Sequence, residues 1–294
     1  MTSTRGQVRG GSLLRRRARV VPVVLFALAA LSGCGGGATQ VATATPSLTQ
    51  VRVSGSGTAM PLVRKLAKEY TRAHPDVRFD FKQGTNSGAA ISGLKDGTLD
   101  LAVVNRKLKP AEVGGVSYVP IARDAVAFAV GPWAQVDSIS TAQVRRIYGG
   151  KVADWRQLGA QARPLVVLDR DADESARKLF LLPVLAGQAI GARTAELTKA
   201  SEMADALAGT PGAFGYTAVG YLSAAGVRGV RPLALDGTAP TADNLTAGRY
   251  PWALTLALVH RSKDPKALRD FVAFASGSSA SATLKAYGYA PPPD

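Results

Sequence analysis

The chain has 294 residues, with 36 lysines and arginines against 21 aspartates and glutamates, a formal net charge of +15 and a single cysteine. This length allows one large domain or two of medium size. One cysteine excludes a disulfide within the chain. The basic residues are scattered and only 6% of the residues are aromatic, so we expect no nucleic-acid partner. The basic excess favours an anionic ligand or surface.

The N-terminal segment has the pattern of a secretory signal peptide. Six arginines precede an apolar run from Val20 to Leu31, which is short for a membrane-spanning helix. Leu31-Ser32-Gly33-Cys34 resembles a bacterial lipobox, in which the cysteine becomes the lipidated first residue of the mature protein. We therefore predict a signal peptide at 1–33, a lipid anchor on Cys34, a flexible tether over 34–50 and an extracytoplasmic location at the cell membrane.

The segment Val53–Leu62 reads as an apolar strand that passes through a turn rich in glycine and hydroxyl groups into a helix opened by Pro61. Such a turn suits an anion, because the first N–H groups of a helix have no partner within the helix and lie at its positive end. Ser56 and Thr58 would add hydroxyl donors. The same residues also suit an ordinary turn between a strand and a helix.

Strands and helices alternate over the remaining chain, so we predict an α/β fold. The first predicted helix has Leu62, Val63, Leu66, Ala67 and Tyr70 on one face and ends at His74-Pro75. It is followed by a strand at Val77–Phe81, a helix opened by Gly84–Gly88 and a buried strand at Leu99–Val104. Further along, a capping box of Ser140 and Gln143 starts a helix, and Asp264-Pro265 caps a late helix.

Several segments, in this order, resemble the PstS-like, phosphate-type substrate-binding proteins of ABC transporters. They are Gly55-Ser56-Gly57-Thr58 with Pro61-Leu62, Gln83-Gly84 with Ser87-Gly88, Asp100-Leu101-Ala102 with Arg106, Pro120–Asp124, Ile147–Lys151 with Trp155 and Leu158-Gly159, Gly212–Tyr216, Tyr250-Pro251 and Tyr287–Pro291. The resemblance covers roughly residues 51 to 292, and Ile147–Lys151 with Trp155 is its most specific part.

The resemblance implies a type II periplasmic-binding fold, with two α/β lobes joined by two crossover strands and a ligand cleft between the lobes. Lobe one would comprise 51–121 plus 231–294 and lobe two 122–230, with crossovers near Pro120–Ala122 and Gly229–Leu233. It also implies phosphate or a related oxyanion as ligand and an ABC permease as partner, without a cofactor or a metal.

The resemblance also implies binding residues. The turn Thr58-Ala59-Met60 and Ser87 match the anion donors of lobe one. Arg170 matches an arginine of lobe two that grips an oxyanion, although a solvated loop residue is an equal alternative. Asn105 stands where relatives have an acidic or hydroxyl residue, and its amide could donate or accept. Arg106 is similar to a family arginine, although a surface ion pair fits it equally well.

One segment departs from the family pattern. After the arginine the family has three residues and then Ser-Gly-Thr. With Arg177 and Phe180 kept in register, this chain has Glu174-Ser175-Ala176 there, whereas a shift by one residue would recover Ser175 as a donor and lose those two matches. Two hydroxyls are lost and a carboxylate is gained. Glu174 could face water at a helix start together with Asp171 and Asp173. Alternatively, it could face the cleft, pair with Arg170 or Arg106 and take the place of the anion. In that case we expect an altered ligand, or a lipoprotein that keeps the fold and serves as a sensor or interaction module.

We expect no enzyme. The chain has two histidines, His74 at a helix end and His260 before Arg261 and Ser262. Neither has a partner at the spacing of a metal site or a catalytic triad.

Overall fold

The computed structural model describes residues 48–292, so the predictions for the signal peptide, Cys34 and most of the tether lie outside it. The strands are β1 (Thr49–Gly55), β2 (Val77–Phe81), β3 (Leu101–Val104), β4 (Val116–Val130), β5 (Ser138–Ile139), β6 (Val166–Arg170), β7 (Thr194–Leu197), β8 (Ala213–Ala218), β9 (Arg231–Pro232), β10 (Ala234–Leu235) and β11 (Ala253–Arg261). The helices are α1 (Met60–Ala73), α2 (Ser87–Lys95), α3 (Thr141–Tyr148), α4 (Leu182–Leu185), α5 (Ala200–Gly209), α6 (Val219–Ala225), α7 (Ala242–Thr246), α8 (Lys266–Ser276) and α9 (Ser281–Ala286), with short turns η1 (Pro110–Glu112), η2 (Trp155–Leu158), η3 (Arg177–Leu181) and η4 (Ser278–Ala280).

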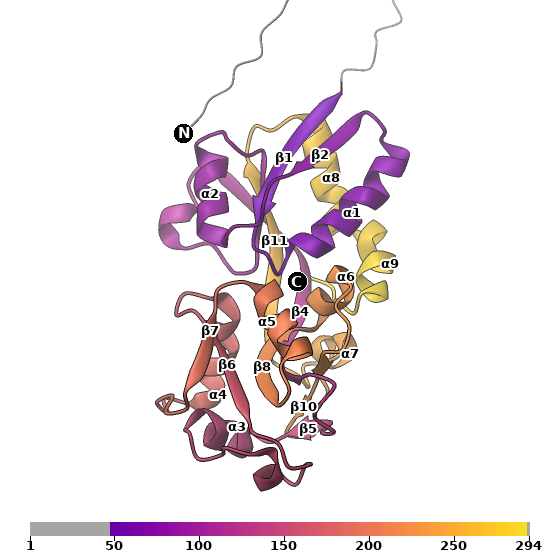
Figure 1. Ribbon diagram of the computed structural model, residues 1–294. Coiled ribbons are helices and arrows are strands. Elements are labelled where there is room, and N and C mark those ends of the chain that lie inside the picture. The colour runs from indigo at the N-terminus through magenta and orange to yellow at the C-terminus, as the bar shows by residue number, and fades with distance from the viewer. Residues whose placement is uncertain (1–47, 293–294) are drawn as a thin grey trace, which may run out of the picture. The chain divides into compact units, whose positions relative to one another are not determined.

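One mixed sheet runs through the described residues in the order β2-β1-β3-β11-β4-β8-β6-β7, with β9 beside β4. We call lobe one the part around β1, β2 and β3 with α1, α2 and α8, and lobe two the part around β6, β7 and β8 with α3, α4 and α5. The long strands β4 and β11 are antiparallel and connect the lobes (Figure 1). This is the predicted α/β arrangement with two crossover strands. β1 begins at Thr49, so residues 49 and 50 belong to the strand and not to the predicted tether.

The sheet of lobe one is covered by helices on both faces. Because side chains alternate along a strand, Leu101 and Val103 of β3 pack in the core that contains α1 and α8, whereas Ala102 and Val104 pack with Ile91 of α2. All four β3 residues are buried. This double cover explains why the strand reads as a continuous apolar run in the sequence.

An aromatic cluster forms the core of lobe two. The ring centroids of Phe128 and Phe180 lie 4.6 Å apart, and those of Phe128 and Phe214 lie 5.4 Å apart. Tyr148 and Trp155 are buried beside them, and Trp155 donates from Nε1 to the Gly212 carbonyl at 2.9 Å. The segment that resembles the family most specifically therefore supplies core residues of lobe two.

The second crossover differs from the prediction near Gly229–Leu233. β9 pairs with β4, and β10 pairs with β5, which directly precedes α3 of lobe two. The amide and the hydroxyl of Thr141 both donate to Asp236, at 2.8 and 2.6 Å. Residues 231–238 therefore contact lobe two, and β11 is the strand that returns to lobe one. The rest of the predicted lobe division stays a proposal.

The helix starts were predicted with mixed success. Ser140 and Gln143 form the predicted capping box of α3, with the Gln143 amide donating to Ser140 Oγ at 3.1 Å. The Asp264 cap of α8 was wrong. Pro265 precedes the helix without a side-chain cap, and the buried Asp264 carboxylate lies 3.3 Å from His260 Nδ1 and 3.3 Å from Arg261 Nε. The contacts with His260 and Arg261 hold this carboxylate away from the helix start.

Candidate functional site

A cleft of about 810 Å³ lies between the lobes. Lobe one lines it with the turns at 56–61 and 83–88 and with residues 105, 106 and 109, and lobe two lines it with residues from 170–179 and 198–201. Eight of the predicted site residues line this cleft: Thr58, Met60, Ser87, Asn105, Arg106, Arg170, Glu174 and Ser175. Ala59 and Ala176 are buried beside it and do not line it.

The first turn of lobe one is fixed by its glycine. An added Cβ at Gly55 would lie 2.0 Å from the Val103 carbonyl oxygen, so only glycine allows β1 to approach β3 so closely. The turn then closes on Ser56, whose carbonyl accepts the N–H groups of Ala59 and Met60, both at 3.0 Å. These two N–H groups were predicted as anion donors, and the structure uses them within the first turn of α1. The Thr58 side chain lines the cleft.

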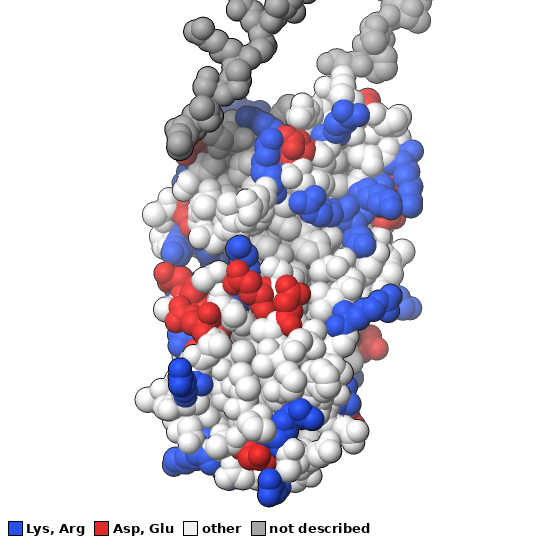
Figure 2. Space-filling model, viewed as in Figure 1, with Lys and Arg blue, Asp and Glu red and all other residues white. Residues whose placement is uncertain are grey.

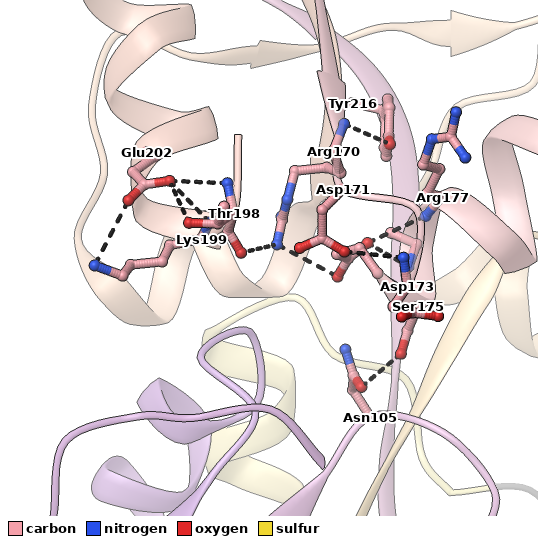
Figure 3. A network of polar contacts seen from close by, with 12 residues as sticks. Asn105, Arg170, Asp171, Asp173, Ser175, Arg177, Thr198, Lys199, Glu202 and Tyr216 are labelled. Carbon is pink, nitrogen blue, oxygen red and sulfur yellow. Dashed lines mark hydrogen bonds and ion pairs between the residues drawn. The ribbon is translucent and has the colours of Figure 1, made fainter. Parts of the chain in front are cut away.

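Asn105 is the point where the lobes meet. Its Oδ1 accepts a hydrogen bond from Ser87 Oγ at 3.1 Å within lobe one and from Ser175 Oγ at 3.0 Å across the cleft (Figure 3). Ser87 is the first residue of α2, which Asn86 caps through a 2.9 Å bond from the Ala89 amide. The amide of Asn105 therefore acts as an acceptor. It holds the Ser87 hydroxyl, which was predicted to serve an anion, and the Ser175 hydroxyl.

Arg106 forms an ion pair with Glu112. Its two terminal nitrogens lie 2.7 and 2.8 Å from the two carboxylate oxygens, in a bidentate geometry. The hydrogen bonds from Arg106 hold the pKa of Glu112 below its usual value. Of the two alternatives for Arg106, the structure therefore shows the ion pair, although the residue still borders the cleft.

Arg170 ends β6 and reaches into the cleft. One terminal nitrogen donates to the Thr198 carbonyl at 3.2 Å (Figure 3), and its Nε is buried without a hydrogen-bond partner in residues 48–292. The neighbouring Asp169 anchors the strand end, because it accepts from Tyr216 Oη at 2.8 Å and from Arg177 Nε at 3.0 Å. Arg170 is thus a buried cleft cation and not a solvated loop residue.

Glu174 faces Arg170 and caps its own helix. Its Oε2 accepts the amides of Ala176 at 2.6 Å and Arg177 at 3.1 Å, and its Oε1 lies 3.6 Å from an Arg170 terminal nitrogen. The two side chains are only 9% and 8% exposed. Helical turns run without a break over residues 175–185, so the carboxylate lies at the positive end of a helix. Of the two predicted orientations, the structure shows the one in the cleft.

Other acidic residues border lobe two's side of the cleft. Asp171 and Asp173 line it beside Glu174, and Lys178 lies 2.6 Å from Asp173. Figure 2 shows acidic side chains gathered across the middle of this face of the molecule. The cleft is therefore not a uniformly basic pocket, in spite of the overall positive charge.

Two carboxylates near the cleft were missed by the sequence reasoning. Glu202 of α5 caps its helix by accepting from the amides of Thr198 and Lys199 at 2.9 and 3.0 Å. A glutamate three residues after the N-cap position, here Lys199, is half of a capping-box pattern and could have revealed it. Asp124 of β4 is fully buried and accepts the amides of Gly220 and Tyr221 at 2.6 and 3.0 Å. Burial raises the pKa of Asp124 to about 7.

The histidines lie away from the cleft. His74 stacks on Tyr70, with ring centroids 4.1 Å apart, and His260 pairs with Asp264. Within residues 48–292 no group of three His, Cys, Asp or Glu side chains is arranged to hold a metal ion. In the same part of the chain no helix has the length and apolar character needed to span a bilayer.

The comparisons with known proteins agree with this architecture. Residues 40–278 match the PBP superfamily domain PBP_like_2. The phosphate-binding protein PstS of Bacillus subtilis is 30% identical over 207 residues, which are 68% of this chain and 67% of that protein.

Two solved structures share the fold. A substrate-binding protein from Clostridium perfringens, solved with bound phosphate, has a TM-score of 0.71 at 22% identity, over 83% of this chain and 99% of the other. An ABC-type phosphate transport receptor from Vibrio cholerae has a TM-score of 0.60 at 24% identity, over 83% and 100%. The chain therefore belongs to the PBP superfamily, as a PstS-like member with the two-lobe periplasmic-binding fold.

Proposed function

We propose that this protein is an extracytoplasmic, lipid-anchored solute-binding protein that takes phosphate or a related oxyanion and delivers it to an ABC permease. One observation carries the proposal: the buried Arg170 of lobe two lines the same cleft as the Thr58 and Ser87 turns of lobe one. A guanidinium with an unpartnered buried Nε opposite hydroxyl-bearing turns suits a small oxyanion. The relatives named above support phosphate as the first ligand to test.

Direct binding measurements test this proposal. The purified chain would be titrated by calorimetry and followed by thermal unfolding with phosphate, sulfate, phosphonates and phosphate esters. A ligand present at 100 times its Kd stabilises the folded state by about 2.7 kcal/mol, which a shift in Tm reveals. Saturable binding of an oxyanion that Arg170→Met abolishes supports the proposal. Failure of every oxyanion to bind or to stabilise the folded chain would refute it. Hydrolysis of a phosphate ester by the purified chain would instead reopen the enzymatic alternative.

The lipid anchor needs its own test, because Cys34 lies outside the described residues. We expect Cys34→Ser to release the protein from the membrane or to leave the precursor uncleaved. Normal processing with unchanged membrane retention would contradict this part of the proposal.

A second function is favoured by Glu174. A carboxylate that faces Arg170 opposes the binding of a dianion, so we also consider a PstS-like lipoprotein that acts as a sensor or interaction module or binds a different ligand. Deletion of the gene separates the two functions. Loss of phosphate uptake supports transport, whereas normal uptake with an altered response to phosphate supports the sensor.

A further inference from the structure

Lobe two offers three hydrogen-bond donors that suit an oxyanion: the amides of Ala176 and Arg177 and the guanidinium of Arg170. We call them the lobe-two donor set. The two amides donate to the Glu174 carboxylate at 2.6 and 3.1 Å, and a terminal nitrogen of Arg170, which donates to the Thr198 carbonyl, forms an ion pair with the same carboxylate at 3.6 Å. A helix start and a guanidinium are the features that bind phosphate groups and carboxylates alike. Glu174 thus has the contacts that an anionic ligand would otherwise make.

We propose that Glu174 is a built-in competitor for the ligand, which occupies the lobe-two donor set and keeps the affinity of the cleft for doubly charged oxyanions low. The inference rests on the proposed function, because it concerns the same cleft. It makes Glu174 the residue that decides which anions enter.

The surroundings of Glu174 leave its negative charge in the cleft. Arg170 lies beside it, and the neighbouring Arg177 is already paired with Asp169. A phosphate dianion near Arg170 would therefore lie within a few ångströms of an ionised carboxylate, where like charges repel strongly even with partial screening. The Nε of Arg170 remains buried without a partner in the described residues, so a donor is left that the carboxylate does not satisfy.

The donors of lobe one are also bonded to acceptors of the chain itself. The Ser87 hydroxyl donates to Asn105 Oδ1, which also accepts from Ser175 of lobe two, and the amides of Ala59 and Met60 donate to the Ser56 carbonyl. An entering oxyanion must replace contacts that the chain already makes with its own acceptors. Each replaced hydrogen bond subtracts from the affinity that the ligand gains.

Glu174 could also be no more than a helix cap, and the chain contains a matched control for that role. Glu202 caps α5 through two backbone amides at the rim of the same cleft, but its carboxylate does not line the cleft. Both residues are glutamates that accept two amides at a helix start. If capping were the whole role of Glu174, the two positions would respond alike to the same substitution.

The experiment is calorimetric titration of inorganic phosphate at pH 7 into the full chain and four variants. These are Glu174→Gln, Glu174→Ser, the triple change Glu174→Ser with Ser175→Gly and Ala176→Thr, and the control Glu202→Gln. Circular dichroism and the Tm confirm that each variant is folded. We expect at least one variant at position 174 to bind phosphate at least about tenfold more tightly than the native chain, with the triple variant tightest and Glu202→Gln unchanged.

The outcomes separate the two proposals. Native binding that is already tight and is not improved by any change at Glu174 would overturn the competitor role and leave the phosphate-binding function standing. Binding that appears only after Glu174 is replaced would support the competitor role and contradict phosphate as the native ligand. If no folded variant binds phosphate, the competitor role is overturned and phosphate is excluded as the ligand of the proposed function. An equal gain from Glu202→Gln would show a general charge effect and would also overturn the competitor role.

Discussion

The two halves of the cleft both offer hydrogen-bond donors, but these donors contact different acceptors in the two lobes. In lobe one, the turns at Thr58 and Ser87 carry no carboxylate at the helix start, and their donors contact neutral acceptors. In lobe two, Glu174 lies at the helix start, accepts the two amides of the lobe-two donor set and forms an ion pair with Arg170. The difference teaches that a fold can keep its binding geometry while one side chain decides whether the geometry remains open to a ligand.

The comparison of the lobes depends first on how strongly core packing stabilises the helical segment that follows Glu174. Phe180 lies in the helical segment that follows Glu174, is 1% exposed and packs in the aromatic cluster. Replacing Phe180 by alanine should lower the free energy of unfolding by about 4 kcal/mol, because it leaves a cavity in the core. Urea denaturation followed by circular dichroism measures this. The neighbouring Leu179 is 48% exposed, so Leu179→Ala should cost less than about 1 kcal/mol. Equal losses would show that this segment is not anchored by its core face.

Arg170 tests whether lobe two depends on its buried ion pair. Arg170→Met should lower the free energy of unfolding by about 3 kcal/mol, because it leaves the Glu174 carboxylate buried beside the cleft without its cation. The control is Arg156→Met. Arg156 lies 3.8 Å from Asp154 but is 73% exposed, so its loss should cost no more than about 1 kcal/mol. Urea denaturation of both variants gives the difference. If Arg170→Met and Arg156→Met lower the free energy of unfolding equally, the ion pair of Arg170 and Glu174 contributes little to stability. The contrast between the two lobes would then be weaker.

Much of the fold could be predicted from the residues, because local patterns specify it. The strand Val77–Phe81 was predicted with its observed bounds, and the Ser140 box starts α3 as expected. The return strand was misplaced because β9 and β10 have two residues each, too few for any periodicity, and their pairing with β4 and β5 depends on distant partners.

The cleft was harder to predict than the fold. Family resemblance selected residues that do line one cleft, but spacing alone left Glu174 free to face water or Arg170. The structure resolves this through the amides of Ala176 and Arg177, which bind the carboxylate on the cleft side of the helix. The bond between Ser175 and Asn105 joins residues 70 positions apart and has no local signal.

The contribution of the junction between the lobes to the free energy of unfolding should depend on pH. Asp124 is buried on β4 and accepts two amides at the start of α6, and burial raises its pKa to about 7, far above the value of about 3.9 in an unfolded chain. Between these two values the folded state binds more protons than the unfolded state, so stability falls as the pH rises. We expect the contribution of Asp124 to the free energy of unfolding to decrease by about 2 kcal/mol from pH 5 to pH 7.

The test compares slopes and not absolute stabilities. Asp124→Asn should cost about 1–3 kcal/mol, because its amide nitrogen would face a backbone N–H, but it should remove this decrease between pH 5 and pH 7. Urea denaturation at several pH values measures both effects. Asp236→Asn changes an exposed carboxylate and should leave the slope unchanged. If Asp124→Asn keeps the native dependence of the free energy of unfolding on pH, another group causes that dependence. The junction would then not be more sensitive to pH than the two lobes.

The smallest expected effect comes from the bond across the cleft. Ser175 Oγ donates to Asn105 Oδ1 at 3.0 Å, so Ser175→Ala should lower the free energy of unfolding by about 1 kcal/mol. Ser201→Ala is the control, because Ser201 borders the same side of the cleft but is exposed, and we expect a change within about 0.5 kcal/mol. Chemical denaturation of both variants, with phosphate absent, isolates the contact between the lobes. If Ser175→Ala has no effect beyond that of the control, the contact does not stabilise the lobes against each other.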